Sequence, residues 1–178
     1  PDARLLLAVR EITRAPTVLS LVKNAGFTAV RRSQMKTGED IIQHPEVIVL
    51  DTIGELGREY SLADVVFVGG SFVKVGGHNI LEPAAHGKPV LVGPYMFNFR
   101  DIFDLLSRRG ACIMTGNEKE FEKILFRLLE DSEKIEQMGT AALEVVRENQ
   151  GGTRRNIDFF EKLAKKYNIK LMEKPHES

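Results

Sequence analysis

The strongest constraint on the fold is a repeated alternation of short apolar runs with longer segments of helical character. The runs are four to six residues long, are rich in Val, Ile and Leu, and lack polar alternation. Such runs suit strands that are buried on both faces, as in a parallel sheet covered by helices. The alternation therefore predicts an α/β fold, a doubly wound parallel sheet flanked by helices. The expected strands cover residues 4–9, 27–32, 47–50, 65–68, 89–92 and 111–114.

Turn signals mark the ends of the helices expected between these strands. Pro16 suits the first turn of a helix, and Gly26, Gly87 and Gly110 each suit a left-handed helix exit. Beyond residue 114 the pattern becomes wholly helical. The expected helices cover residues 16–24, 54–63, 79–86, 99–109, 119–129, 132–148 and 154–167. We expect one domain over residues 1–167, followed by a tail at 168–178.

Composition excludes several classes of function. The chain has 25 basic and 25 acidic residues, so it lacks the basic footprint of a nucleic-acid-binding protein. No apolar run approaches the roughly 18–20 residues that span a bilayer, so this segment is not expected to anchor itself in a membrane. Cys112 lies in an apolar run and is expected in the core. The four histidines form no ligand-like set, so we expect no metal and no cofactor.

The turn after residue 68 is the strongest candidate for ligand binding. In open α/β sheets, ligands bind beyond the carboxyl ends of the strands. Here the sequence reads GGSFVKVGGHNILEP over residues 69–83, with one glycine pair on each side of the loop. The backbone at Gly70, Ser71 and Gly77 could approach a phosphate or carboxylate closely. The spacing matches neither the dinucleotide fingerprint nor a P-loop, so either an unfamiliar anion site or a flexible turn would explain it.

Asn79 and Glu82 follow this loop and have two interpretations. The pattern N-x-x-E is a capping box, in which Asn79 caps a helix and Glu82 bonds back to the cap backbone. Alternatively, Glu82 points into the crevice and accepts hydrogen bonds from ribose hydroxyls. Spacing alone favours capping but leaves both interpretations open.

Two other strand ends carry candidate residues. After residue 50, Asp51 or Thr52 could cap the next helix, or the backbone of Glu55–Gly57 could contact a base edge. After residue 9, Arg10 and Arg14 are well placed to bind a phosphate in bidentate fashion, although most surface arginines are only solvated.

Together these segments resemble the Kdo (3-deoxy-D-manno-octulosonic acid) transferases of lipopolysaccharide synthesis, which belong to the two-domain GT-B glycosyltransferases. The most specific block is GGHNILEP at residues 76–83, since its pattern is unlikely beside the others by chance. The other matching blocks, in the family's order, are DTIGEL at 51–56, AD at 63–64, VGGS at 68–71, GP at 93–94 and NF at 98–99. The similarity weakens after residue 116.

The resemblance implies a fold, a reaction and a set of donor-binding residues. The fold is the C-terminal domain of GT-B type, a Rossmann-like parallel sheet flanked by helices with a helical C-terminal extension. The reaction is a metal-independent, inverting transfer of Kdo from CMP-Kdo to a lipid A precursor at the cytoplasmic face of the bacterial inner membrane. The implied donor-binding residues are Arg10, Glu11, Glu55, Leu56, Gly57, Gly70, Ser71, Gly77, Asn79, Ile80, Leu81 and Glu82.

Two departures from the family pattern shape the expectation. Glu11 stands where the family typically has a histidine, and an acidic side chain beside a phosphate is unfavourable unless it points away. In the family, a strand–helix unit and an acceptor-binding domain precede the position that matches Pro1, and the acceptor-binding domain carries the catalytic base. We therefore expect a donor-binding part of a longer enzyme, inactive alone, with no catalytic base of its own and an exposed edge or gap in its sheet. The alternatives are another GT-B protein that uses a UDP-sugar, as a transferase or 2-epimerase, and a non-catalytic α/β binding module.

Overall fold

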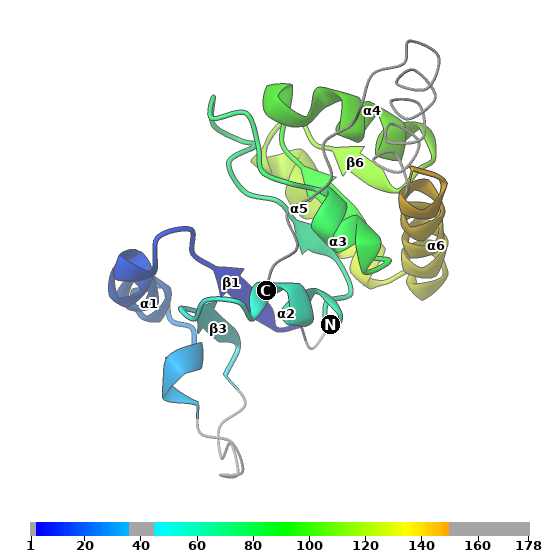
Figure 1. Ribbon diagram of the computed structural model, residues 1–178. Helices are drawn as coiled ribbons and strands as arrows, with labels where there is room; N and C mark the ends of the chain where they lie inside the picture. The colour runs from blue at the N-terminus through cyan, green and yellow to red at the C-terminus, as the bar shows by residue number, and fades with distance from the viewer. Residues whose placement is uncertain (1–2, 36–44, 150–178) are drawn as a thin grey trace, which may run out of the picture.

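A computed structural model describes residues 3–35 and 45–149 of the 178-residue chain (Figure 1). The strands lie close to the expected positions, each trimmed by at most three residues. They are β1 (Leu5–Ala8), β2 (Ala29–Arg31), β3 (Val47–Leu50), β4 (Val66–Phe67), β5 (Val90–Val92) and β6 (Cys112–Met114). The helices are α1 (Ala15–Asn24), α2 (Leu56–Tyr60), α3 (Leu81–Ala85), α4 (Arg100–Arg108), α5 (Glu118–Leu129) and α6 (Ser132–Asn149). Short 3₁₀ turns are η1 (Ile12–Arg14), η2 (Arg32–Gln34) and η3 (Phe97–Phe99).

All the strand pairings are parallel, which confirms the predicted α/β class. The strands divide into two three-stranded sheets, in the orders β1-β3-β2 and β4-β5-β6 (Figure 1). Within the described residues, the outer strands of the two sheets, β1, β2, β4 and β6, each pair with a single strand and are therefore sheet edges. The sequence predicted one continuous layer, and the described residues instead form two sheets.

The second sheet contains the hydrophobic core. Strand β5 lies at its centre, and Val90, Leu91 and Val92 are completely buried. One core cluster gathers residues of β5, α3, α4 and α6 on one face, and a second cluster packs Leu91 against α5 and Met138. This sheet is therefore covered by helices on both faces, as the unalternating apolar runs predict.

The first sheet is covered less completely. Val47 and Val49 of the central strand β3 are buried, but Leu5 of β1 is 52% exposed and Leu21 of α1 is 64% exposed. The prediction that every strand is buried on both faces is therefore wrong for β1. Strand β1 is an edge that pairs only with β3, and the apolar sequence cannot show which strands become edges.

The helix ends follow the turn signals, while two helices are shorter than expected. Pro16 lies in the first turn of α1, and Gly26, Gly87 and Gly110 have positive φ angles of 91°, 67° and 72° at the helix exits. Helices α2 and α3 each span only five residues, and both begin two residues later than expected. Asn117 caps α5 by accepting a hydrogen bond from the Glu120 amide (3.0 Å). The expected helix at 154–167 and the tail at 168–178 lie outside the described residues.

Candidate functional site

The candidate residues follow the carboxyl ends of the parallel strands. Ala8 of β1 lies in register with Leu50 of β3, so the segments that begin at Val9 and Asp51 leave the first sheet at the same edge. In the second sheet, Phe67 of β4 lies in register with Leu91 of β5. The glycine loop, residues 69–77, therefore leaves this sheet beside the segment that begins at Gly93.

Ser71 supports the glycine loop from inside the protein. Its side chain is completely buried, and its hydroxyl donates to the Val68 carbonyl oxygen (2.6 Å). The same hydroxyl oxygen accepts a hydrogen bond from the Gly93 amide (2.8 Å). A hydroxyl has one proton to donate, and the fold uses it, so Ser71 acts here through the loop that it holds rather than as an exposed anion ligand.

The glycine loop closes on itself at its two glycine pairs. The Gly77 amide donates to the Gly70 carbonyl oxygen (3.1 Å), and both glycines have positive φ angles, 77° and 71°. A Cβ atom at Gly70 would lie 3.0 Å from Nε2 of His78, so the imidazole ring packs directly on this glycine. The conformation is one that side-chain-bearing residues rarely adopt, which explains glycine at these positions.

Asn79 and Glu82 form a turn that resembles a capping box without completing it. The Asn79 side-chain oxygen accepts from the Leu81 amide (3.0 Å), so Asn79 satisfies a donor at the start of α3. The Asn79 side-chain nitrogen donates to the Glu82 carboxylate (3.0 Å), so Glu82 bonds to the asparagine side chain where a full capping box has a bond to the backbone. Glu82 is exposed and held in one orientation by this bond.

Helix α2 brings the candidate residues that follow β3 next to those at the start of α3. Glu55, Leu56 and Gly57 lie at its start, and α2 contacts α3, which begins with the candidates Leu81 and Glu82. Tyr60 at the end of α2 stacks obliquely on His86, with ring centroids 5.9 Å apart. Burial raises the pKa of Tyr60, and the nearby negative charge of Glu82 raises it further.

A polar network that sequence analysis did not identify lies where β2 and β3 end. The Asp51 carboxylate accepts hydrogen bonds from the Ser33 amide (2.8 Å) and hydroxyl (2.7 Å), and Arg31 lies 3.8 Å away. Burial raises the pKa of Asp51, but the Ser33 bonds and the Arg31 charge outweigh it, so the pKa is lowered overall. Asp51 therefore ties two strands together, and the alternative in which it caps α2 is wrong. A signal was present, since polar residues begin at Arg31 within the run expected at 27–32 and continue to Ser33.

The same network holds Glu55. Arg32 forms an ion pair with the Glu55 carboxylate (3.1 Å), and the Thr52 hydroxyl donates to the other carboxylate oxygen. Glu55 is the N-cap residue of α2 and its side chain makes no capping bond. The alternative in which Thr52 caps this helix is therefore wrong as well. Arg32 and Thr52 therefore hold the Glu55 side chain at the start of the Glu55–Gly57 segment.

Arg10 and Glu11 lie on the turn after β1. Both are exposed, and Glu11 precedes η1, where its carbonyl oxygen accepts from the Arg14 amide (2.9 Å). Among the described residues, no hydrogen bond or ion pair connects this turn to the glycine loop. The structure therefore brings the α2 and α3 candidates together, and it leaves Arg10 with the other sheet.

Comparison with known protein families decides the class of this site. The family model for group 1 glycosyl transferases matches residues 40–145, which is more than half of the chain and includes the glycine loop and both helices α2 and α3. The chain belongs to the group 1 glycosyl transferases. The predicted enzyme class is thereby confirmed at the level of the family.

Individual relatives within this class confirm the resemblance to Kdo transferases. The chain is 39% identical to a 3-deoxy-D-manno-octulosonic acid transferase from Haemophilus influenzae, over 89% of this chain and 36% of that protein. It is 34% identical to the enzyme of the same name from Bordetella pertussis, over 90% of this chain and 37% of that protein. The chain thus spans little more than a third of the length of these relatives.

A solved structure has the same architecture. The C-terminal CMP-Kdo binding domain of WaaA from Acinetobacter baumannii matches with a TM-score of 0.71 and 27% sequence identity, over 82% of this chain and 90% of that one. The GT-B-like arrangement of parallel strands and helices predicted from the sequence is confirmed by this match and by the family assignment.

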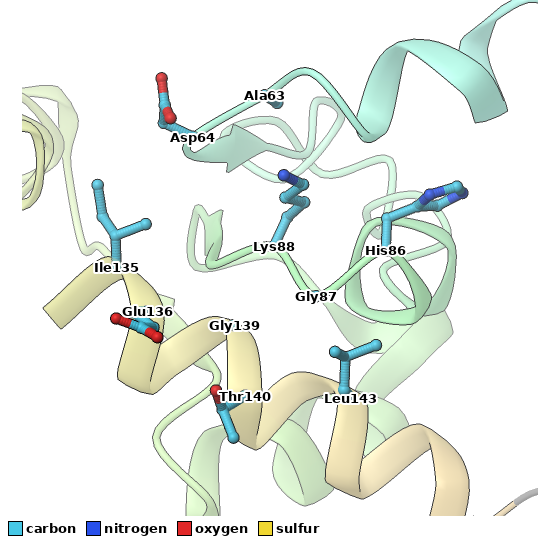
Figure 2. A pocket seen from close by; sticks show the side chains of 10 residues that line it. All are labelled: Ala63, Asp64, His86, Gly87, Lys88, Ile135, Glu136, Gly139, Thr140 and Leu143. Carbon is cyan, nitrogen blue, oxygen red and sulfur yellow. The ribbon is translucent and has the colours of Figure 1, made fainter. Parts of the chain in front are cut away.

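Other features of the described residues lie away from this site. A pocket between α3 and α6 is lined by Asp64, His86, Lys88 and Thr140, among others (Figure 2). Asp64 and Lys88 precede β4 and β5, so this pocket is at the amino ends of the strands, opposite the glycine loop. Over residues 3–35 and 45–149, no cluster of three or more metal-ligand side chains occurs. In the same part of the chain, no helix is long and apolar enough to cross a membrane.

Proposed function

We propose that this chain binds CMP-Kdo, the sugar donor, for a glycosyltransferase that adds Kdo to a lipid A precursor. The likeness to the C-terminal CMP-Kdo binding domain of WaaA carries the proposal, because it extends over most of both chains. The glycine loop and the two short helices beside it supply the chemistry that such a donor needs. CMP-Kdo offers a base edge, ribose hydroxyls, a phosphate and the carboxylate of the acid sugar.

In this proposal Glu82 accepts hydrogen bonds from the ribose hydroxyls. The carboxylate is exposed and is oriented by Asn79 at 3.0 Å, so its direction is set before any ligand binds. Hydroxyl donors to a carboxylate form charge-assisted hydrogen bonds, which are stronger than neutral ones. Ile80 and Leu81 shape the segment, and Ile80 anchors it by complete burial in the core.

The remaining donor contacts come from backbone groups and one arginine. The segment at Glu55, Leu56 and Gly57 offers its backbone to the cytosine edge, and Arg32 and Thr52 hold the Glu55 side chain at its start. Gly70 and Gly77 let the loop approach the phosphate side of the donor, with Ser71 as the support beneath.

In this proposal Arg10, on the turn after β1, pairs with the donor phosphate. Glu11 shapes the same turn through its backbone, since its carbonyl oxygen accepts a hydrogen bond from the Arg14 amide (2.9 Å).

The transfer itself needs groups outside this chain. We propose an inverting, metal-independent reaction with no cofactor, in which another domain binds the lipid A precursor and supplies the catalytic base. That reaction takes place at the cytoplasmic face of the bacterial inner membrane, and membrane association comes from the full-length protein. The chain alone binds donor nucleotide and transfers no sugar.

Calorimetric titration of CMP and UDP into the chain tests this proposal, with Glu82→Ala as the key variant. Glu120→Ala is a matched control, because Asn117 and Glu120 repeat the N-x-x-E spacing at the start of α5. If Glu82 binds ribose, only Glu82→Ala weakens CMP binding, by about 10- to 100-fold for a lost charged hydrogen bond. Glu120→Ala leaves CMP affinity unchanged.

Two results would count against this assignment. Equal CMP affinity in both variants would make Glu82 a capping residue only. Tighter binding of UDP than of CMP would assign the chain to a UDP-sugar enzyme instead.

A further inference from the structure

The glycine loop is joined to a second loop, residues 93–99, which connects β5 to α4. Three hydrogen bonds around Ser71 fix the near end of the glycine loop. The Tyr95 amide donates to the Ser71 carbonyl oxygen (2.9 Å), and the Gly93 amide donates to the Ser71 hydroxyl oxygen (2.8 Å). The Ser71 hydroxyl in turn donates to the Val68 carbonyl oxygen (2.6 Å). The far end of the glycine loop, near Val75 and Gly76, is closed by the Gly77 amide, which donates to the Gly70 carbonyl oxygen (3.1 Å). The second loop contacts this end as well.

Asn98 holds that far end. Its side-chain nitrogen donates to the Val75 carbonyl oxygen (2.9 Å), and its backbone amide donates to the Gly76 carbonyl oxygen (3.2 Å). The two loops touch so closely that a Cβ atom at Gly76 would lie 2.4 Å from the Asn98 side-chain nitrogen. A Cβ atom at Gly77 would lie 2.3 Å from the Met96 sulfur.

A purely structural role does not account well for this contact. Asn98 is exposed, its side-chain bond to Val75 lies at the surface, and neither residue belongs to a core cluster. A surface hydrogen bond of this kind adds little to global stability, because water replaces it when it breaks. Its effect is local, on the loop that leads directly into Asn79 and Glu82.

We propose that Asn98 is a positioning residue for donor binding. By holding Val75 and Gly76, it orders the glycine loop before the nucleotide arrives, so less conformational entropy is lost on binding. The inference rests on the proposed function and deepens it, since Asn98 is not among the residues that contact the donor in that proposal. It acts through the loop.

The test compares Asn98→Ala and Asn98→Asp with Asn149→Ala. Asn149 is a matched control, because its side-chain nitrogen also donates to a backbone carbonyl, that of Val145 (2.8 Å), on α6. Calorimetric titration with CMP should show binding weakened about tenfold in Asn98→Ala, the order expected when a loop must be ordered on binding. Asn98→Asp keeps the size but cannot donate at neutral pH, so it should lose as much. Asn149→Ala should bind like the wild type.

Amide hydrogen exchange in the nucleotide-free protein separates local opening of the glycine loop from a loss of global stability. In Asn98→Ala, the Gly77 amide should exchange at least about tenfold faster, since its loop opens more often, while the buried amides of Val90 and Val92 stay protected. Protected core amides also show that the variant is folded. Unchanged exchange at Gly77 would overturn the inference.

The binding outcomes separate this inference from the proposed function. If the wild type binds CMP and both Asn98 variants bind it equally well, Asn98 does not position the site and the inference is wrong. If Asn98→Asp alone binds like the wild type, hydrogen-bond donation to Val75 is not the mechanism and the inference is again wrong. If the wild type itself binds no CMP, the proposed function fails first.

Discussion

Replacing Ser71 by alanine should destabilise the protein far more than most serine substitutions. The change removes two buried hydrogen bonds at once, to the Val68 carbonyl (2.6 Å) and from the Gly93 amide (2.8 Å). Both backbone groups belong to buried residues, so neither gains a water molecule in exchange. An unpaired buried polar group costs about 1–3 kcal/mol, so we expect a loss of about 2–4 kcal/mol once partial relaxation is allowed.

Ser61→Ala is the matched control for this experiment. The Ser61 hydroxyl also donates to a carbonyl three residues earlier, that of Arg58 (2.7 Å), but this bond is exposed. Its loss should change the free energy of unfolding by no more than about 0.5 kcal/mol, as for a surface substitution. Urea denaturation followed by circular dichroism measures both variants. Equal, small losses in the two would refute the claim that Ser71 is the buried support of the glycine loop.

Two further predictions concern packing and pH. Gly139→Ala should cost about 1–3 kcal/mol of stability by overpacking, because a Cβ atom there would lie 2.2 Å from the Gly87 carbonyl oxygen. Gly57→Ala, where a Cβ atom meets nothing within 4 Å, should be neutral or slightly stabilising, and urea denaturation measures both variants. The lowered pKa of Asp51 should stabilise the fold above its unfolded pKa, about 4, and this contribution should vanish as the pH falls through the folded value. Asp51→Asn should therefore flatten the fall in unfolding free energy between pH 5 and about 2, and an unchanged slope would mean that the Ser33 bonds do not control it.

Patterns that are local in the sequence predicted much of the fold. The unalternating apolar runs located the strands, because a strand covered on both faces needs apolar residues at every position. Glycines after apolar stripes located the exits of α1, α3 and α4, since each requires a positive φ angle. The burial of Cys112 was likewise predicted from its apolar neighbours and is confirmed; burial raises its pKa to about 12.

Features that depend on pairing between distant segments could not be predicted. The bond between Ser33 and Asp51 joins residues 18 positions apart, and the Asn98 bond to Val75 spans 23. Neither spacing has a signature, because both follow from how strands and loops meet in three dimensions. The division into two sheets has the same origin, since the sequence of β1 does not encode which of its edges finds a partner.

The candidate site falls between these cases. The order of the blocks identified the loop and helix that begin at Gly69 and Asn79, and glycine at Gly70 and Gly77 matches the positive φ angles there. The sequence could not show that the Ser71 hydroxyl points inward, because a serine beside a glycine pair suits an anion site and a buried support equally. The donor-contacting roles of the candidate residues remain predictions.

The most direct test of the central claim is a CMP titration of the isotope-labelled chain, followed through its backbone amide chemical shifts. The account predicts saturable shifts at Gly70, Gly77 and the residues from Asn79 to Glu82, with weaker or no shifts when UDP replaces CMP. The amide chemical shifts of Asp64 and Lys88, at the opposite ends of the strands, should not change. A folded chain whose glycine-loop amides do not move at any CMP concentration would contradict the account.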